Sequence, residues 1–334
     1  MSTKSGSTDD RTAAFSRNVQ LESLLRDINS TLWVSEQKLL GNPQALQYPL
    51  VLIMGPMRSG TTLFMQWLAN TGLFSYPTNL LSRFYQAPVI GAMIQLLLTD
   101  PRYNFRDELG EFVQQAEYKS ENGKTKGVLA PNEFWYFWRR FFSDPERDIW
   151  TDEQLRESMD TRTMRAELAG MMGIFQKPFV AKGILFNYNI PFLASTFDNA
   201  LFVQIKRDPV TNVASVLDAR RRQYGNERRW YSFKIPEYEE LRGLDAITQV
   251  AGQVHYVDKA VTKGLEGLDE SRKLVVRYEE FCTNPRDMFY KIINKTGLDG
   301  EIYRGPTQFT LSRNIRGADS IPISKALKYY SGNI

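Results

Sequence analysis

The sequence predicts an α/β fold in which helices flank a central parallel sheet, and three observations support this prediction. Short apolar runs, which are typical of buried strands, alternate along the chain with longer segments of helical periodicity. The run at 50–54 leads into a glycine-containing loop and then a helix. The run at 200–207 is followed by Pro209, which suits the first turn of a helix. Strands that alternate with helices in this way form βαβ units, whose strands are parallel.

The first hundred residues contain two long helical patterns around the first strand. Helical periodicity predicts a helix over 12–40, which a Gly-Asn-Pro segment stops. The strand and its loop come next, and then a helix that begins near Thr62. Residues 71–79 are predicted to form a turn with room for a second strand, and an apolar face predicts a helix over 80–99.

The remaining elements repeat these patterns. Helices are predicted over 153–175, 189–197, 209–221, 243–264 and 285–295, and strands at 179–182, 200–207 and 273–278. Residues 100–132 are polar and punctuated by glycine, which indicates an insertion or lid. The tail over 300–334 is predicted to be irregular.

The composition is that of a globular protein, with 42% hydrophobic and 24% charged residues among 334. A net charge of +4 suits an anionic cofactor or an acidic acceptor, but it is too small to indicate nucleic-acid binding. The chain has one cysteine, Cys282, and one histidine, His255, which excludes an intramolecular disulfide and a histidine-pair zinc site. We expect one domain over 1–334, with 1–10 disordered and no transmembrane span. We also expect a cytoplasmic location, and the sequence leaves open whether the protein forms a homo-oligomer.

The loop after the first strand has the layout of a phosphate-binding loop. Its spacing is Gly55-x-x-x-x-Gly60, followed by Thr61 and Thr62, and the helix N-terminus would turn backbone N–H groups toward an anion. A loop for nucleoside triphosphates would carry lysine directly after the second glycine. Here the cation comes earlier, at Arg58. The loop therefore fits a 5′-phosphate, and a kinase that uses ATP is disfavoured.

A second motif follows the predicted strand at 200–207. Arg207 stands at the end of this strand, and Ser215 lies eight residues later in the next predicted helix. Ligands of doubly wound sheets bind at the carboxyl ends of strands. An arginine there can form two hydrogen bonds to a phosphate, and a helix hydroxyl can add another.

Three motifs together resemble the sulfotransferase superfamily that uses 3′-phosphoadenosine 5′-phosphosulfate (PAPS), in a bacterial-type or carbohydrate-type member. Residues 56–63 resemble its 5′-phosphosulfate loop, 204–215 its 3′-phosphate motif, and 277–281 its Tyr-Glu-Asp segment near the adenosine. They occur in the family's order and cover about residues 48–285. The resemblance implies a three-layer, P-loop-like α/β fold. It also implies in-line transfer of a sulfuryl group from PAPS to an acceptor, without a metal, releasing adenosine 3′,5′-bisphosphate.

The resemblance assigns roles to residues of these motifs. The donor-binding residues that it implies are Arg58, Ser59, Gly60, Thr61, Thr62, Arg207, Ser215, Tyr278 and Arg316. Arg316 belongs to a segment, 312–317, that departs from the lysine-rich form of the cytosolic enzymes. Arg58 would stabilise charge on the leaving phosphate, and Lys182, at the end of a predicted strand, would place a second cation over the sulfuryl group.

The acceptor needs a general base, and no acid occurs between Thr62 and Leu98. Cytosolic small-molecule relatives use histidine, but His255 lies away from the matching segments. We favour Glu133, because the aromatic residues that follow it would desolvate its carboxylate and suit it to act near neutral pH. Glu117 is the second candidate.

The segment after Glu133 carries seven aromatic residues within 134–142. It predicts either a buried aromatic helix or the wall of an acceptor pocket, which makes 100–150 the acceptor-side region. The basic segment 220–230 is either a solvated charge run or a loop over an anionic ligand.

The sequence does not identify the acceptor. A carboxylate base favours a carbohydrate or glycolipid as the acceptor. A phenol, a peptide tyrosine or another small molecule remains an alternative acceptor. Two alternatives to a sulfotransferase remain at this point: a P-loop kinase, and a nucleotide-binding regulator without catalysis.

Overall fold

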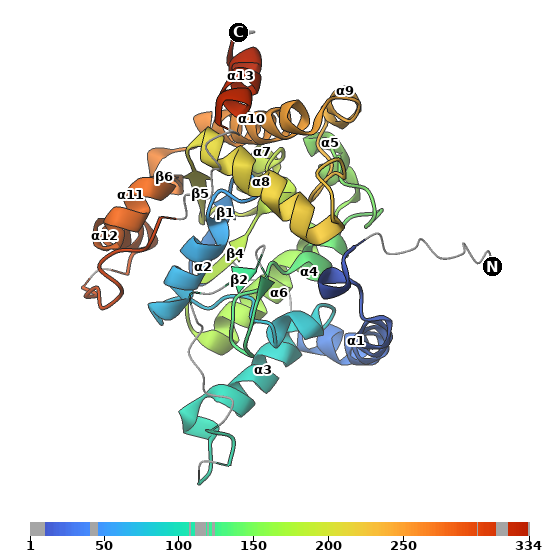
Figure 1. The fold of residues 1–334 in the computed structure, drawn as a ribbon. Helices are drawn as coiled ribbons and strands as arrows, with labels where there is room; N and C mark the ends of the chain where they lie inside the picture. The colour runs from blue at the N-terminus through green and yellow to red at the C-terminus, as the bar shows by residue number, and fades with distance from the viewer. Residues whose placement is uncertain are drawn as a thin grey trace, which may run out of the picture.

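The computed structural model describes residues 11–40, 46–106, 108–110, 118, 120–121, 124–298, 300–311 and 320–332. Within these ranges, four parallel strands form a sheet in the order β4-β1-β5-β6. The strands are β1 (Leu50–Met54), β4 (Phe179–Lys182), β5 (Ala200–Lys206) and β6 (Lys273–Arg277). Figure 1 shows them at the centre of the molecule with helices on both faces, which confirms the predicted three-layer α/β architecture. A two-stranded antiparallel pair, β2 (Ser120–Glu121) and β3 (Lys124–Thr125), lies apart from this sheet.

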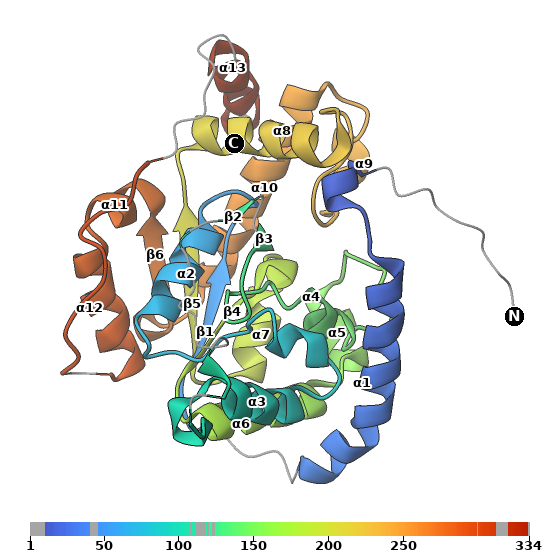
Figure 2. The same cartoon turned by 60° about the horizontal axis from the view of Figure 1, so that its bottom comes forward.

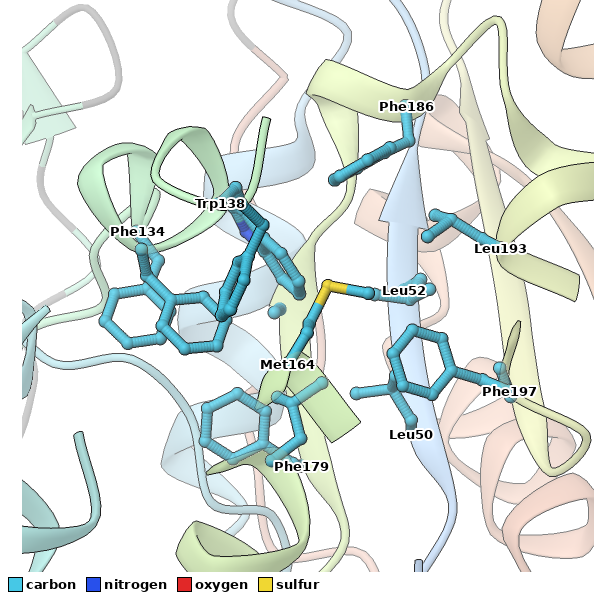
Figure 3. Close-up of a cluster of buried hydrophobic side chains, with 14 of the residues drawn as sticks. Leu50, Leu52, Phe134, Trp138, Met164, Phe179, Phe186, Leu193 and Phe197 are labelled. Carbon is cyan, nitrogen blue, oxygen red and sulfur yellow. The ribbon is translucent and has the colours of Figure 1, made fainter. Parts of the chain in front are cut away.

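The alternation of side chains along β1 builds two separate cores. Leu50, Leu52 and Met54 point into one core, and Val51 and Ile53 point into the other. All five residues are buried, as expected for a central strand covered on both faces. Figure 3 shows the first of these cores, where side chains of the sheet meet those of several helices.

Different sets of helices cover the two faces. The first core receives side chains from α4 (Trp135–Arg139), α5 (Asp152–Ser158), α6 (Thr161–Phe175) and α7 (Ile190–Thr196). The second receives them from α2 (Thr61–Asn70), α11 (Tyr278–Thr283) and α12 (Pro285–Thr296). A third cluster joins α8 (Pro209–Tyr224), α10 (Ala246–Glu266) and α13 (Ser320–Ser331), beside the short helix α9 (Tyr238–Leu241).

The strand register brings the predicted site segments to one edge of the sheet. Ile53 pairs with Lys182, Met54 with Gln204, and Lys206 with Arg277. The loop after β1, the end of β4, the turn after β5 and the start of α11 therefore meet at the carboxyl ends of the strands. This is the edge where doubly wound sheets bind ligands.

Several predicted boundaries were wrong. The helix predicted over 80–99 is a 3₁₀ helix, η2 (Leu81–Phe84), followed by α3 (Pro88–Thr99), because a residue before proline disfavours helical backbone. The helix predicted over 12–40 begins later, as α1 (Val19–Leu39), where the side chain of Asn18 caps it.

Three further predictions differ from the structure in part. The segment predicted over 153–175 divides into α5 and α6, and the side chain of Asp160 caps α6. Residues 71–79 contain isolated bridges, such as Ser75 with Phe179, in place of a strand. The tail predicted to be irregular contains α13.

Candidate active site

Two buried asparagines hold the loop that follows β1. The Asn187 side chain forms two hydrogen bonds with Gly55: its Oδ1 accepts from the backbone N–H at 3.0 Å, and its Nδ2 donates to the carbonyl at 2.9 Å. Asn212 Nδ2 donates to the carbonyl of Met57 at 2.8 Å. Because Asn187 lies in the segment after β4 and Asn212 lies in α8, the loop is held from two separate segments. The sequence patterns did not single out either asparagine.

Gly60 ends the loop in close contact with Tyr278. Its φ is +105°, and a Cβ at this position would lie 2.2 Å from Cδ2 of the Tyr278 ring. Tyr278 is only 5% exposed. Glycine is therefore the residue that both the backbone conformation and the ring permit here. The next residue, Thr61, begins α2, whose N-terminus carries partial positive charge.

Two arginines converge above this loop. Arg207 donates from Nη1 to the carbonyl of Arg58 at 2.9 Å, and its guanidinium lies 4.8 Å from the centre of the Tyr278 ring. Arg58 donates from Nε to Ser215 Oγ at 3.3 Å. Burial lowers the pKa of Arg207, and the neighbouring Arg58 lowers it further. An anion bound beside both guanidinium groups would offset their mutual repulsion.

The side chain of Lys182 contacts both Thr62, at the start of α2, and Glu133, the predicted general base. Its side chain is 2% exposed, and Nζ donates to Thr62 Oγ1 at 2.7 Å and to Glu133 Oε1 at 3.0 Å. Trp135 Nε1 donates to the other oxygen, Glu133 Oε2, at 2.5 Å. The buried ammonium thus has a carboxylate partner, as a buried charge requires. Both oxygens of Glu133 are oriented by fixed donors.

The loop, both arginines and Glu133 line one cavity of about 600 Å³ at the sheet edge, whereas Lys182 lies behind Thr62 and Glu133 and is not among the lining residues. The predicted residues that line it are Arg58, Gly60, Thr61, Thr62, Glu133, Arg207, Ser215 and Tyr278. The side chain of Ser59 is fully buried instead, so this residue faces the protein interior. Arg316 and Glu117 lie outside the described residues.

The cavity also has lining residues that the sequence analysis missed. They include Gln66, Thr211, Asp218, Tyr231, Ser232 and Thr310. Asp218 lies on α8 three residues after Ser215, so helical spacing from that serine could have identified it, and it forms an ion pair with Arg222 of the predicted basic segment. Burial raises the pKa of Tyr231 to about 12, and Glu133 adds to this rise while Arg58 opposes it.

The basic segment 220–230 matches neither predicted role completely. Arg220 is fully buried and donates to the side chain of Gln253 at 3.2 Å, so it anchors α8 to α10. Arg222, by contrast, lines the cavity. His255 does not line the cavity, because it lies on α10 and stacks against Tyr330.

Two further observations concern metal binding and membrane spanning. Among the residues that the structure describes, no group of His, Cys, Asp and Glu side chains could hold a metal ion. Across the same part of the chain, no helix combines the length and apolar character needed to cross a membrane.

Comparison with solved structures identifies similar folds. The chain is similar to sulfotransferase STF1 from Mycobacterium tuberculosis H37Rv, at 16% identity and a TM-score of 0.50, over 97% of this chain and 83% of that one. Sulfotransferase STF9 from Mycobacterium avium matches over 95% and 74%, at 16% identity and a TM-score of 0.48. A sulfotransferase from Alicyclobacillus acidocaldarius matches over 86% and 96%, at 14% identity and a TM-score of 0.42. At such identities the likeness concerns the fold alone.

Comparison with families is more direct. No curated protein sequence matches this chain significantly. The model that describes the Sulfotransferase family, however, matches residues 49–301, which span β1 to the end of α12 and include the whole sheet edge described above. The chain therefore belongs to the sulfotransferase family.

Proposed function

We propose that the protein transfers a sulfuryl group from PAPS to an acceptor hydroxyl, with Glu133 as the general base and without a metal. The observation that carries this proposal is the cavity that Arg58, Thr62, Arg207 and Glu133 line together. It combines cations and a helix N-terminus, which suit an anionic donor, with a carboxylate that can accept the proton of the acceptor.

The donor would lie across the carboxyl edge of the sheet. Thr61, Thr62 and the N-terminus of α2 would hold the 5′-phosphate, because the first turn of a helix has N–H groups without intrahelical partners. Arg207 and Ser215 would hold the 3′-phosphate. Tyr278, which already packs against Arg207, would contact the adenosine.

The transfer is a displacement at sulfur. The acceptor oxygen attacks the sulfur atom while the bond from sulfur to the bridging oxygen breaks, and the electron pair stays on the 5′-phosphate. Glu133 takes the acceptor proton, so the products are a sulfate ester and adenosine 3′,5′-bisphosphate. Arg58 would stabilise the charge that develops on the leaving oxygen.

Lys182 would lie between the donor and the general base. It donates to Thr62 on the donor side and to Glu133 on the acceptor side. Its charge would therefore act on the transferring group while its bond orients the carboxylate. This double contact favours Glu133 over a base from elsewhere in the chain.

The direct test is a transfer assay with PAPS labelled at sulfur and a panel of alcohols, phenols and sugars. We expect a sulfated product and an equal amount of adenosine 3′,5′-bisphosphate, with no loss of rate when EDTA is present. Release of ADP from ATP with the same acceptors would contradict the proposal. Binding of adenosine 3′,5′-bisphosphate without transfer to any acceptor would support a regulator instead.

A further inference from the structure

A second cavity meets the first at Glu133. It has a volume of about 890 Å³ and lies on the side of Glu133 formed by η2, 125–136 and α1. Its lining includes Leu21, Leu25, Asn79, Asn132, Trp135 and Tyr136. If the proposed function is correct, an acceptor in this second cavity can reach the base while the donor occupies the first.

Helix α1 forms one wall of this cavity, through Leu21 and Leu25. This helix lies outside residues 49–301, the part of the chain that the family model matches. Figure 2 shows α1 along one flank of the molecule. The wall therefore lies outside the part of the chain that the family model describes.

Two fully buried polar side chains fix α1 in place. Asn29 donates from Nδ2 to the carbonyl of Arg83 at 2.7 Å, and its Oδ1 accepts from the N–H of Gln86 at 2.7 Å. Glu36 accepts from the N–H groups of Val89 and Ile90, at 2.7 and 3.0 Å, which are donors of the first turn of α3. The position of Leu21 and Leu25 is therefore set by directional bonds along the helix.

The side-chain amides that line the second cavity, Asn79 and Asn132, already form hydrogen bonds within the protein. Asn79 donates from Nδ2 to the carbonyl of Gly127 at 3.0 Å, and its Oδ1 accepts from Asn132 Nδ2 at 2.9 Å. Asn132 Oδ1 accepts from the N–H of Phe134 at 2.9 Å. A carbohydrate would need several such groups to bind its hydroxyls, because buried polar groups must be paired. These amides instead hold the wall together.

The rest of the lining is mostly apolar and carries little charge. Aliphatic and aromatic side chains come from α1, from Leu80 and from 128–136, and the charged lining residues are Arg83, which is exposed, and Glu133. One cation beside a carboxylate does not suit a polyanion. An apolar body would gain from burial against the leucines and the aromatic rings.

We infer that the acceptor is an uncharged alcohol or phenol with an apolar body, which Leu21 and Leu25 of α1 help to select. The body packs between α1 and the aromatic segment, and the hydroxyl reaches Glu133. This inference rests on the proposed function and replaces the carbohydrate that the sequence favoured.

The test uses the fluorescence of 2-naphthol, titrated into enzyme saturated with adenosine 3′,5′-bisphosphate. Leu25→Asp places a charge in the wall, and we expect it to weaken 2-naphthol binding by about tenfold or more. Leu24→Asp is the matched control on the same helix: Leu24 is 56% exposed and does not line the cavity, so binding should be unchanged. Methyl glucoside should not displace the probe, and 6-hydroxy-2-naphthoate should bind more weakly than 2-naphthol.

The outcomes separate this inference from the proposed function. Failure of the wild type to bind the nucleotide would contradict the proposed function itself. Normal nucleotide binding with no binding of 2-naphthol, or with displacement by methyl glucoside, would overturn the acceptor class. Equal binding by Leu25→Asp and Leu24→Asp would overturn the role of α1. Unchanged nucleotide affinity of Leu25→Asp shows that this variant is folded, and Leu21→Ser provides a second, milder change in the same wall.

Discussion

The contact between Gly60 and Tyr278 makes a quantitative prediction about the loop. In Gly60→Ala, the new Cβ would lie 2.2 Å from Cδ2 and 2.4 Å from Cε2 of the ring. The positive φ by itself costs an L-residue about 1–2 kcal/mol, and overpacking adds about 1–3 kcal/mol. We therefore expect Gly60→Ala to lower the free energy of unfolding by about 2–5 kcal/mol.

The chain offers a matched control at the C-terminus of α8. Gly225 also has a positive φ, +72°, but a Cβ there would meet nothing within 4 Å. Gly225→Ala should cost only the backbone part, about 1–2 kcal/mol. The effect of alanine on the unfolded chain is common to both variants and cancels in the comparison.

The assay is urea unfolding followed by circular dichroism, together with calorimetric titration of adenosine 3′,5′-bisphosphate. Displacing the Tyr278 ring would disturb its contact with Arg207, so Gly60→Ala should weaken nucleotide binding by about tenfold or more, whereas Gly225→Ala should not. In a Tyr278→Leu background, the excess cost of Gly60→Ala should shrink, because the two positions are in contact. Equal loss of stability in Gly60→Ala and Gly225→Ala, with equal nucleotide affinity, would refute the reasoning.

Three further predictions concern the base, the loop and the single histidine. Glu133→Gln should lower kcat by about 10²–10⁴-fold in the transfer assay while the Kd for adenosine 3′,5′-bisphosphate stays the same; normal turnover would assign the base elsewhere. Asn187→Leu leaves the N–H and carbonyl of Gly55 without their side-chain partner, so urea unfolding should show a loss of at least about 2 kcal/mol, and an unchanged midpoint would argue against this role. Burial lowers the pKa of His255 below 6.5, so the unfolded chain binds this proton more readily and stability should fall as the pH drops below 6.5. His255→Phe should lack this component when melting is followed across that pH range; an identical pH profile would contradict it.

The segments that the sequence predicted well are those whose signal is local. The loop of 55–62 and the pair Arg207 and Ser215 are defined by spacing within one strand–turn–helix unit, and each unit folds as its pattern indicates. Parallel pairing then places the ends of these units at one edge, so their meeting in one cavity follows from the fold class.

The parts that the sequence did not predict depend on contacts between distant segments. Asn187 and Asn212 hold the loop from 132 and 155 residues away, and nothing in their own surroundings marks them. The choice of Glu133 rested on its aromatic neighbours, whereas the structure adds Lys182, 49 residues away, as the partner of its carboxylate.

Helix α1 is a further case of this kind. Its periodicity predicted a helix but not its role, because a hydrophobic face does not reveal what it faces. The structure turns Leu21 and Leu25 toward the second cavity. The break before Pro88, in contrast, was available from the sequence and was missed.

The most direct test of the central proposal is the affinity for a 3′-phosphate. Calorimetric titration would compare adenosine 3′,5′-bisphosphate with ADP, without magnesium, on the wild type, Arg207→Ala and Arg242→Ala. Arg242 is an exposed arginine that pairs with Glu239 and does not line the donor cavity, so its variant is the matched control. Hydrogen bonds to charged groups contribute about 1.5–3 kcal/mol, so the wild type should prefer the 3′-phosphorylated nucleotide by about tenfold or more. Loss of this preference in Arg207→Ala but not in Arg242→Ala would support a PAPS site, and equal binding of both nucleotides by the wild type would contradict it.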